Sequence, residues 1–187
     1  MKPLLADTAV QAAVEPLRQH ALCEALQQLK EEHVPLVQAA ERLGRLAEGI
    51  GSGPDVEDWT LPLEALGREA AAFAEQLEPH LLREEAGLFP VLTLYMGRRA
   101  GPMEEMEQEQ EHIRSALRRF HYALRQTEGT TADAGEAQAM ADLVQEACMR
   151  FVKLAAKEER VLLPIAEQLL TADEKEQLMM TYFKLIC

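Results

Sequence analysis

Three breaks that carry glycines, prolines and capping residues divide a chain that otherwise favours helix along its length. Alanine, leucine, glutamate, glutamine and arginine dominate, and the alternating β-branched patterns typical of strands are absent from the sequence. The breaks leave four long helical segments, which cover residues 20–48, 61–96, 103–127 and 136–170. Four long helices with short connections predict an all-α fold, an antiparallel up-down four-helix bundle.

The two ends of the chain are expected to add smaller pieces to this bundle. We interpret residues 1–19, which contain two prolines, as an N-terminal extension, and residues 20–170 as the bundle domain. Residues 171–187 are predicted to form a short C-terminal helix. Thr171 and Glu174 have the spacing of a capping box, which marks the start of a helix.

Charge and composition argue against several classes of partner. The formal net charge of −13 opposes binding to the phosphates of nucleic acid and to anionic lipid. The sequence has neither an apolar run long enough to span a membrane nor a signal-peptide pattern, so a cytoplasmic location is expected. The three cysteines lack metal-ligand spacing and are interpreted as reduced thiols. A protein partner and the oligomeric state stay open.

One short stretch occurs twice, in the second and in the fourth helical segment. HLLREEAGLFP, which begins at His80, aligns with LAAKEERVLLP, which begins at Leu154. Helical spacing puts the first residue of each copy and the glutamate four residues later on the apolar face. The first copy therefore presents His80 and Glu84 inward, whereas the second presents Leu154 and Glu158.

The first and third segments each carry a glutamate–histidine pair, Glu32-His33 and Glu111-His112. His33 is in line with apolar residues of its helix, and His112 flanks the apolar stripe of the third segment. A buried carboxylate without a partner is destabilising, so two inward glutamates and three inward histidines at one level of a bundle predict a bound cation. Taken singly, each histidine would more often be a hydrogen-bonded core or boundary residue.

The remaining acidic residues and histidines have simpler interpretations. Four glutamates are expected to be solvent-facing or helix-pairing charges, namely Glu32, Glu85, Glu111 and Glu159. His121 follows His112 by nine residues, about half a turn round the helix, and His20 lies similarly off the face of His33. His20 and His121 are therefore left out of the predicted site.

The four motifs together resemble the hemerythrin-like HHE cation-binding family over most of the chain. In chain order they are EEHVPL, HLLREEAGLFP, EQEHIR and KEERVLLP. The resemblance implies an up-down bundle that holds two non-haem irons. It implies that His33 and His80 bind one iron and that His112 binds the other. Glu84 and Glu158 would bridge the pair.

Leu154 departs from the family pattern, which has a histidine at this position. Leucine offers no lone pair, so the iron near His112 lacks one nitrogen ligand. Three outcomes stay open: water or a substrate fills the position, Glu109 replaces the histidine, or the second metal is lost. The predicted cofactor is iron, as a di-iron site if Glu109 or solvent compensates and as one iron otherwise.

The resemblance implies a function in which iron with open positions binds a small oxidant. We expect binding or sensing of dioxygen, nitric oxide or peroxide, or iron handling in the response to oxidative or nitrosative stress. The sequence leaves open whether the chain is an enzyme. Two alternatives stay open as well, a metal-poor degenerate bundle that acts as an interaction protein and an iron-centre repair protein.

Overall fold

A computed structural model of the chain describes residues 21–53, 56–97, 102–127 and 129–184. The predicted N-terminal extension, His20 and Cys187 lie outside these residues. All regular elements of the described part are helical, and it contains no strand. No helix in these ranges is long and apolar enough to cross a membrane.

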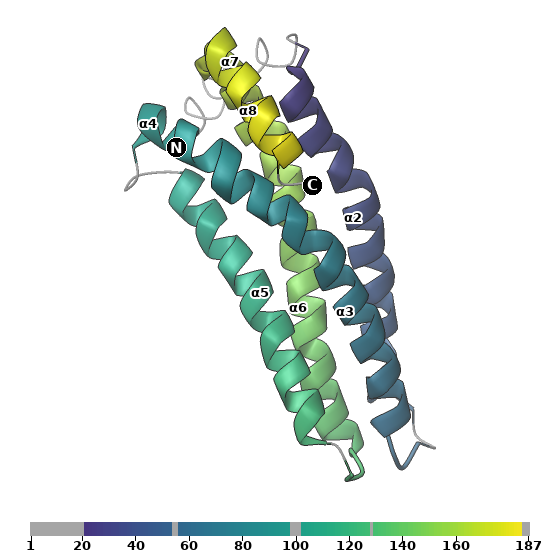
Figure 1. Cartoon of the computed structure of the whole chain (residues 1–187). Coiled ribbons are helices and arrows are strands. Elements are labelled where there is room, and N and C mark those ends of the chain that lie inside the picture. Colours follow the sequence, from purple (N-terminus) through teal and green to yellow (C-terminus); the bar gives the residue numbers. More distant parts are fainter. Residues whose placement is uncertain (1–20, 54–55, 98–101, 128, 185–187) are drawn as a thin grey trace, which may run out of the picture.

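Four long helical stretches pack into a bundle (Figure 1). Two of them are continuous α-helices, α2 (Glu24–Glu48) and α5 (Pro102–Gln126). Each of the other two consists of an α-helix, a π-helical turn and a short α-helix. These elements are α3 (Thr60–Arg83), η2 (Glu84–Leu88) and α4 (Phe89–Met96), followed after α5 by α6 (Ala134–Lys157), η3 (Glu158–Leu162) and α7 (Leu163–Leu169). The predicted all-α four-helix bundle is confirmed.

Local signals in the sequence account for the ends of these helices. The three breaks each contain a glycine with positive φ, at Gly51, Gly97 and Gly129. The C-terminal helix α8 (Ala172–Lys184) begins with the predicted capping box. The backbone N–H of Thr171 donates to Glu174 Oε2 over 2.8 Å, and the backbone N–H of Glu174 donates to Thr171 Oγ1 over 3.3 Å.

The two copies of the repeated stretch both fold into π turns. Pro90 and Pro164 sit in the first turn of α4 and of α7, directly after η2 and η3. A proline has no N–H to donate, and its ring collides with the carbonyl four residues earlier. The backbone N–H before each proline therefore reaches five residues back, from Phe89 to the Glu84 carbonyl and from Leu163 to the Glu158 carbonyl. Such π turns recur at functional sites.

The bundle has two distinct ends (Figure 1). At one end the loops after α2 and after α5 lie side by side, and the backbone N–H of Trp59 donates to the Ala132 carbonyl over 2.9 Å. At the opposite end α8 packs against η2. Gly87 is buried there, and a Cβ atom at this residue would lie 3.0 Å from Leu178 Cδ1. The two π turns therefore lie toward the end that α8 covers.

Candidate metal centre

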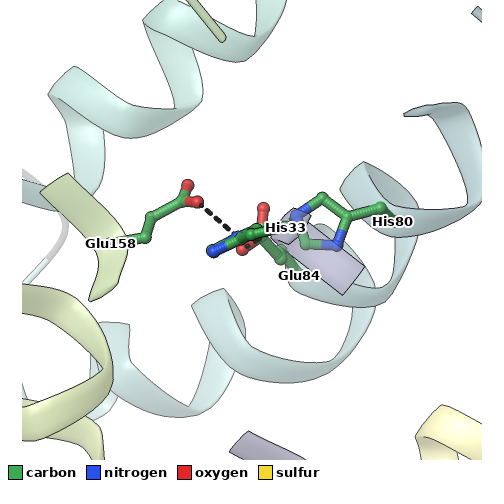
Figure 2. Close-up of side chains that lie close together, drawn as sticks. All are labelled: His33, His80, Glu84 and Glu158. Carbon is green, nitrogen blue, oxygen red and sulfur yellow. Dashed lines mark ion pairs between the residues drawn. The ribbon is translucent and has the colours of Figure 1, made fainter. Parts of the chain in front are cut away.

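Four side chains from four elements meet inside the bundle, as Figure 2 shows. They are His33 of α2, His80 of α3, Glu84 of η2 and Glu158 of η3. One potential ligand atom from each lies within 4.8 Å of the other three. The two imidazoles are 1% exposed and the two carboxylates 0% exposed. The burial predicted for these two histidines and two glutamates is confirmed.

The potential ligand atoms face one another at short range. His33 Nε2 lies 3.2 Å from Glu158 Oε2, the pair dashed in Figure 2, and His80 Nε2 lies 3.7 Å from Glu84 Oε1. The two imidazole rings meet edge to face, with 4.9 Å between their centroids. Ligands about 2.1 Å from an ion lie at most about 4.2 Å apart. A separation of 4.8 Å would therefore have to shorten by at least about 0.6 Å for both atoms to reach a shared cation.

The hydrogen-bond inventory supports the fit of a cation here. Six buried side-chain atoms of this cluster and its neighbour Gln110 have no hydrogen-bond partner in the described part of the chain. They are Nε2 of His33 and His80, Oε1 of Glu84, Oε1 and Oε2 of Glu158, and Oε1 of Gln110. Native proteins leave few buried polar atoms without partners, and a cluster of them requires an explanation. A cation bound by the two imidazoles and the two carboxylates provides one for five of these six atoms.

The outer nitrogen of each imidazole contacts a carboxylate of another element. His80 Nδ1 lies 2.7 Å from Glu32 Oε2, and His33 Nδ1 lies 3.1 Å from Glu159 Oε1. An Nδ1–H that donates to a carboxylate leaves the Nε2 lone pair free to bind a metal. Glu32 is also paired with Arg83, whose Nη2 lies 2.6 Å from Glu32 Oε1. The two carboxylates thus orient the imidazoles, which a solvent-facing position would not do.

This contact corrects the interpretation of two of the four outer glutamates. Glu32 and Glu159 were expected to face solvent or to pair with other helical residues, yet both bond an imidazole of the site. The other two do form the expected charge pairs, Glu85 with Arg114 and Glu111 with Arg118. The two pairs of glutamates differ because the packing of neighbouring helices determines which side chain each glutamate contacts.

The adjacent glutamates of each π turn separate as expected. Glu84 and Glu158 are completely buried, whereas the side chains of Glu85 and Glu159 are 33% and 34% exposed. Adjacent helical residues point about 100° apart, so each Glu-Glu pair divides between the interior and the surface. The expectation that the first glutamate of each pair is the inward one is confirmed.

Burial and neighbouring charge shift the protonation of the centre. The pKa of Glu84 is raised well above its usual value by burial and then by the negative charges of Glu158 and Glu32. Burial opposes protonation of His33. The nearby carboxylates of Glu158 and Glu159 outweigh it, so the pKa of His33 is raised. Without a metal, the centre therefore favours holding protons that a cation would displace.

Gln110 takes the inward position of α5 that the sequence interpretation gave to His112. His112 is exposed and is not part of the cluster. Gln110 is buried, and its Nε2 donates to Glu84 Oε2 over 2.7 Å. The sequence carries the signal for this placement. Gln110 continues the apolar stripe of α5 at spacings of three and four, between Met106 and Ile113, whereas His112 lies beside that stripe.

Leu154 is buried on α6, one turn before Glu158, as the repeat predicts. Glu109, the suggested replacement ligand, is not among the clustered residues. Its Oε2 instead lies 2.8 Å from Nη1 of Arg150 on α6. Neither residue therefore brings a further donor atom to the four that meet in the bundle.

The fold and the cluster together define a class of protein. A helical bundle with two imidazoles and two carboxylates buried at one level is a metal-binding bundle. The family model of the hemerythrin HHE cation-binding domain matches residues 24–166. This match spans more than half of the chain, and the protein belongs to the hemerythrin HHE cation-binding family. A comparison with curated proteins produced no match.

Proposed function

We propose that the chain binds iron through His33, His80, Glu84 and Glu158. The observation that carries this proposal is the convergence of four buried donor groups whose inner atoms have no hydrogen-bond partner among the described residues. Two histidines with one or more carboxylates are the ligand set typical of non-haem ferrous iron. Zinc and manganese accept similar donors, so the identity of the metal is part of the test.

We further propose that the protein binds or senses dioxygen, nitric oxide or peroxide, or handles iron under oxidative or nitrosative stress. Iron in such a centre supplies reversible binding of these small oxidants at its open positions. The protein residues provide the surroundings. Phe151 lies edge to face against His80, with 6.4 Å between ring centroids, and Leu154 and Phe151 are both buried. This enclosure favours a ligand of two or three atoms over a larger substrate.

Leu154 offers an access route for such a ligand. Besides preceding Glu158 by one turn, it lines a cavity of about 510 Å³ between α5 and α6. Met106 and Arg150 belong to the same lining. We propose that small molecules reach the centre past Leu154, because rotation of one leucine side chain requires no backbone movement.

The order of the helices and the location and boundaries of the bundle are further parts of the proposal. The loops after α2 and after α5 lie at one end of the bundle, which supports an antiparallel up-down order of the four helices (Figure 1). The cytoplasmic location and the bundle boundaries at residues 20 and 170 are expectations from the sequence. Small oxidants diffuse freely, so the proposed ligand class is compatible with that location.

Metal content separates this proposal from a metal-poor interaction protein. The chain should be expressed with added iron and reconstituted anaerobically, and its bound metals measured by elemental analysis. We expect iron bound in a fixed ratio, together with a new visible absorption on exposure to azide or nitric oxide. A protein that stays metal-free under these conditions would contradict the iron proposal and favour the interaction protein. Bound iron with no response to azide, nitric oxide, dioxygen or peroxide would contradict the oxidant proposal alone.

A further inference from the structure

We infer that the centre holds one metal ion per chain, and that Gln110 and Leu154 occupy the places where a second ion would need nitrogen ligands. This inference rests on the proposed metal-binding function and deepens it. The family pattern implies two ions, whereas the residues of this chain favour one.

Gln110 blocks the bridging role of Glu84. A carboxylate that bridges two ions uses one oxygen for each of them. Glu84 Oε1 is 3.7 Å from His80 Nε2 and has no hydrogen-bond partner among the described residues, so it is available to the first ion. Glu84 Oε2 accepts a hydrogen bond from Gln110 Nε2 over 2.7 Å. The structure directs the NH₂ group of this amide at Glu84, the orientation in which it donates to an ionised carboxylate. Glu84 is thus a ligand to one ion, oriented by the Gln110 amide.

Among the described residues, α5 and α6 bring no imidazole to the cluster. Gln110 is a buried polar residue of α5, as His33 is of α2, and the sequence repeat aligns Leu154 of α6 with His80 of α3. Leucine has no lone pair to donate. The amide nitrogen of Gln110 is a hydrogen-bond donor and not a metal ligand, so Gln110 could offer a second ion its Oε1 and no nitrogen.

Glu109, the carboxylate suggested as a replacement for the missing nitrogen ligand, is already part of an ion pair. Glu109 directly precedes Gln110, just as Glu32 directly precedes His33. Glu32 orients the His80 ring, but Leu154 gives Glu109 no ring to orient. Glu109 is paired instead with Arg150, with Nη1 2.8 Å and 3.1 Å from its two oxygens. The arginine also adds a positive charge beside the place of a second cation, which opposes its binding.

The decisive experiment counts metal ions in the full chain. Metal-free protein is titrated anaerobically with Co²⁺ and, separately, with Fe²⁺, and bound metal is measured after removal of the excess. We expect saturation at one ion per chain, and an electron paramagnetic resonance signal of an isolated high-spin ion after oxidation of the iron. Two ions per chain, with the silent spectrum of a coupled ferric pair, would overturn the single-ion inference and leave the metal-binding function intact. No bound ion would overturn the function itself.

A restoration variant tests the roles of the two positions. The double substitution Gln110→His/Leu154→His supplies both missing imidazoles, and Glu109 is placed to orient the one at position 154. We expect its saturation to rise from one ion toward two. The matched control Gln110→His/Leu154→Ile keeps the buried volume at position 154 without a donor and should stay nearer to one. A folded double variant that still binds one ion would overturn the assignment of these two positions. If it does not fold, the count on the wild-type chain decides the inference alone.

Discussion

The two halves of the bundle share a backbone plan but differ in chemistry. α2 with α3 brings two imidazoles to the centre, whereas α5 with α6 places Gln110 and Leu154 at the matching positions. Each half contains a π turn that begins with a buried glutamate and is followed by a proline in the next turn. The backbone geometry of the repeat is therefore independent of the nitrogen ligands.

This difference shows which features of a duplicated site are structural. Helical periodicity places Glu84 and Glu158 in the core in both halves, and backbone sterics at the following proline account for the π turn that begins at each of them. The imidazoles have no such backbone cause, so they can be lost from one half while the bundle is kept. The carboxylates outside the cluster also differ between the two halves. Glu32 orients the His80 ring, whereas Glu109 forms an ion pair with Arg150.

The largest effect is expected from removing an imidazole of the first half. His33→Ala deletes one of two nitrogen donors and leaves Glu158 buried without its partner. Bound metal should fall below detection, a larger loss than the about 10–100-fold typical of outer-shell changes. Elemental analysis and metal titration measure this loss. The matched control is His112→Ala in the second half, which removes an exposed imidazole and should leave affinity unchanged. Equal losses in the two variants would contradict the separation of the halves.

The second effect concerns stability and comes from the second half. Leu154→Ala removes a buried side chain that has no donor atom. The free energy of unfolding of the metal-free protein should fall by about 2–5 kcal/mol, while the metal-to-protein ratio stays the same. Urea unfolding and elemental analysis measure the two quantities. Leu154→Ile, which preserves volume, should cost less than about 1.5 kcal/mol. Loss of metal in a folded Leu154→Ala would mean that Leu154 shapes the ligand geometry of the first half.

The third effect is the pH dependence that the buried charges impose. The folded-state pKa of His33 is raised above its ordinary 6.5, and that of Glu84 is raised well above its ordinary 4.5. Below its ordinary pKa, each group is protonated in both the folded and the unfolded state, and its contribution to the free energy of unfolding is fully present. As pH rises toward the folded-state pKa, the unfolded chain releases the proton first and the contribution is lost. Metal-free protein should therefore lose stability from mildly acidic pH upward.

The metal should oppose this loss. A bound cation replaces the protons on His33 and Glu84, so its affinity and its stabilisation should both rise with pH. Urea unfolding of metal-free and loaded protein across about pH 5.5 to 7.5 tests both statements. The net charge of −13 also destabilises the chain as pH rises, so Glu84→Gln is the control that removes the local contribution. Metal-free stability that increases with pH would contradict the raised pKa values.

The sequence predicted the helices well because their signals are local. Glycines with positive φ and the Thr171 capping box act within a few residues, so they need no tertiary information. The inward glutamates also followed from helical periodicity. Helical periodicity does not predict the π turns, because the shifted hydrogen bond follows from the ring and the missing N–H of Pro90 and leaves no mark on the apolar pattern.

The errors at the site arose from helix rotation and from contacts between helices. Gln110 and His112 differ by two residues, and only one of them can face the core. The family motif places His112 in the site, although the apolar stripe of α5 passes through Gln110. The contact between Glu32 and His80 joins residues 48 positions apart. A single sequence contains no signal for such a pair, because it depends on how α2 and α3 are rotated against each other.

The smallest effect compares the outer carboxylates of the two halves. Glu32→Gln keeps the shape of the side chain, but its neutral amide accepts the Nδ1–H of His80 less strongly. The imidazole becomes less basic and less firmly oriented, so metal affinity should fall by about 10–100-fold. Glu32 is also paired with Arg83, and an Arg83→Gln variant shows how much of the loss comes from that pair. Competition titration with a chromophoric chelator measures these affinities.

Glu109→Gln is the matched change in the second half. Its carboxylate pairs with Arg150 and orients no ligand, so affinity should stay within error of the wild type. The comparison becomes sharper in the Leu154→His background, where a ring at position 154 would give Glu109 the role that Glu32 has beside His80. There, Glu109→Gln should weaken metal binding, whereas in the wild-type background it should not. If Glu109→Gln weakens binding in the wild-type chain, Glu109 already acts on the metal, and the second half is not as inert as its side chains indicate.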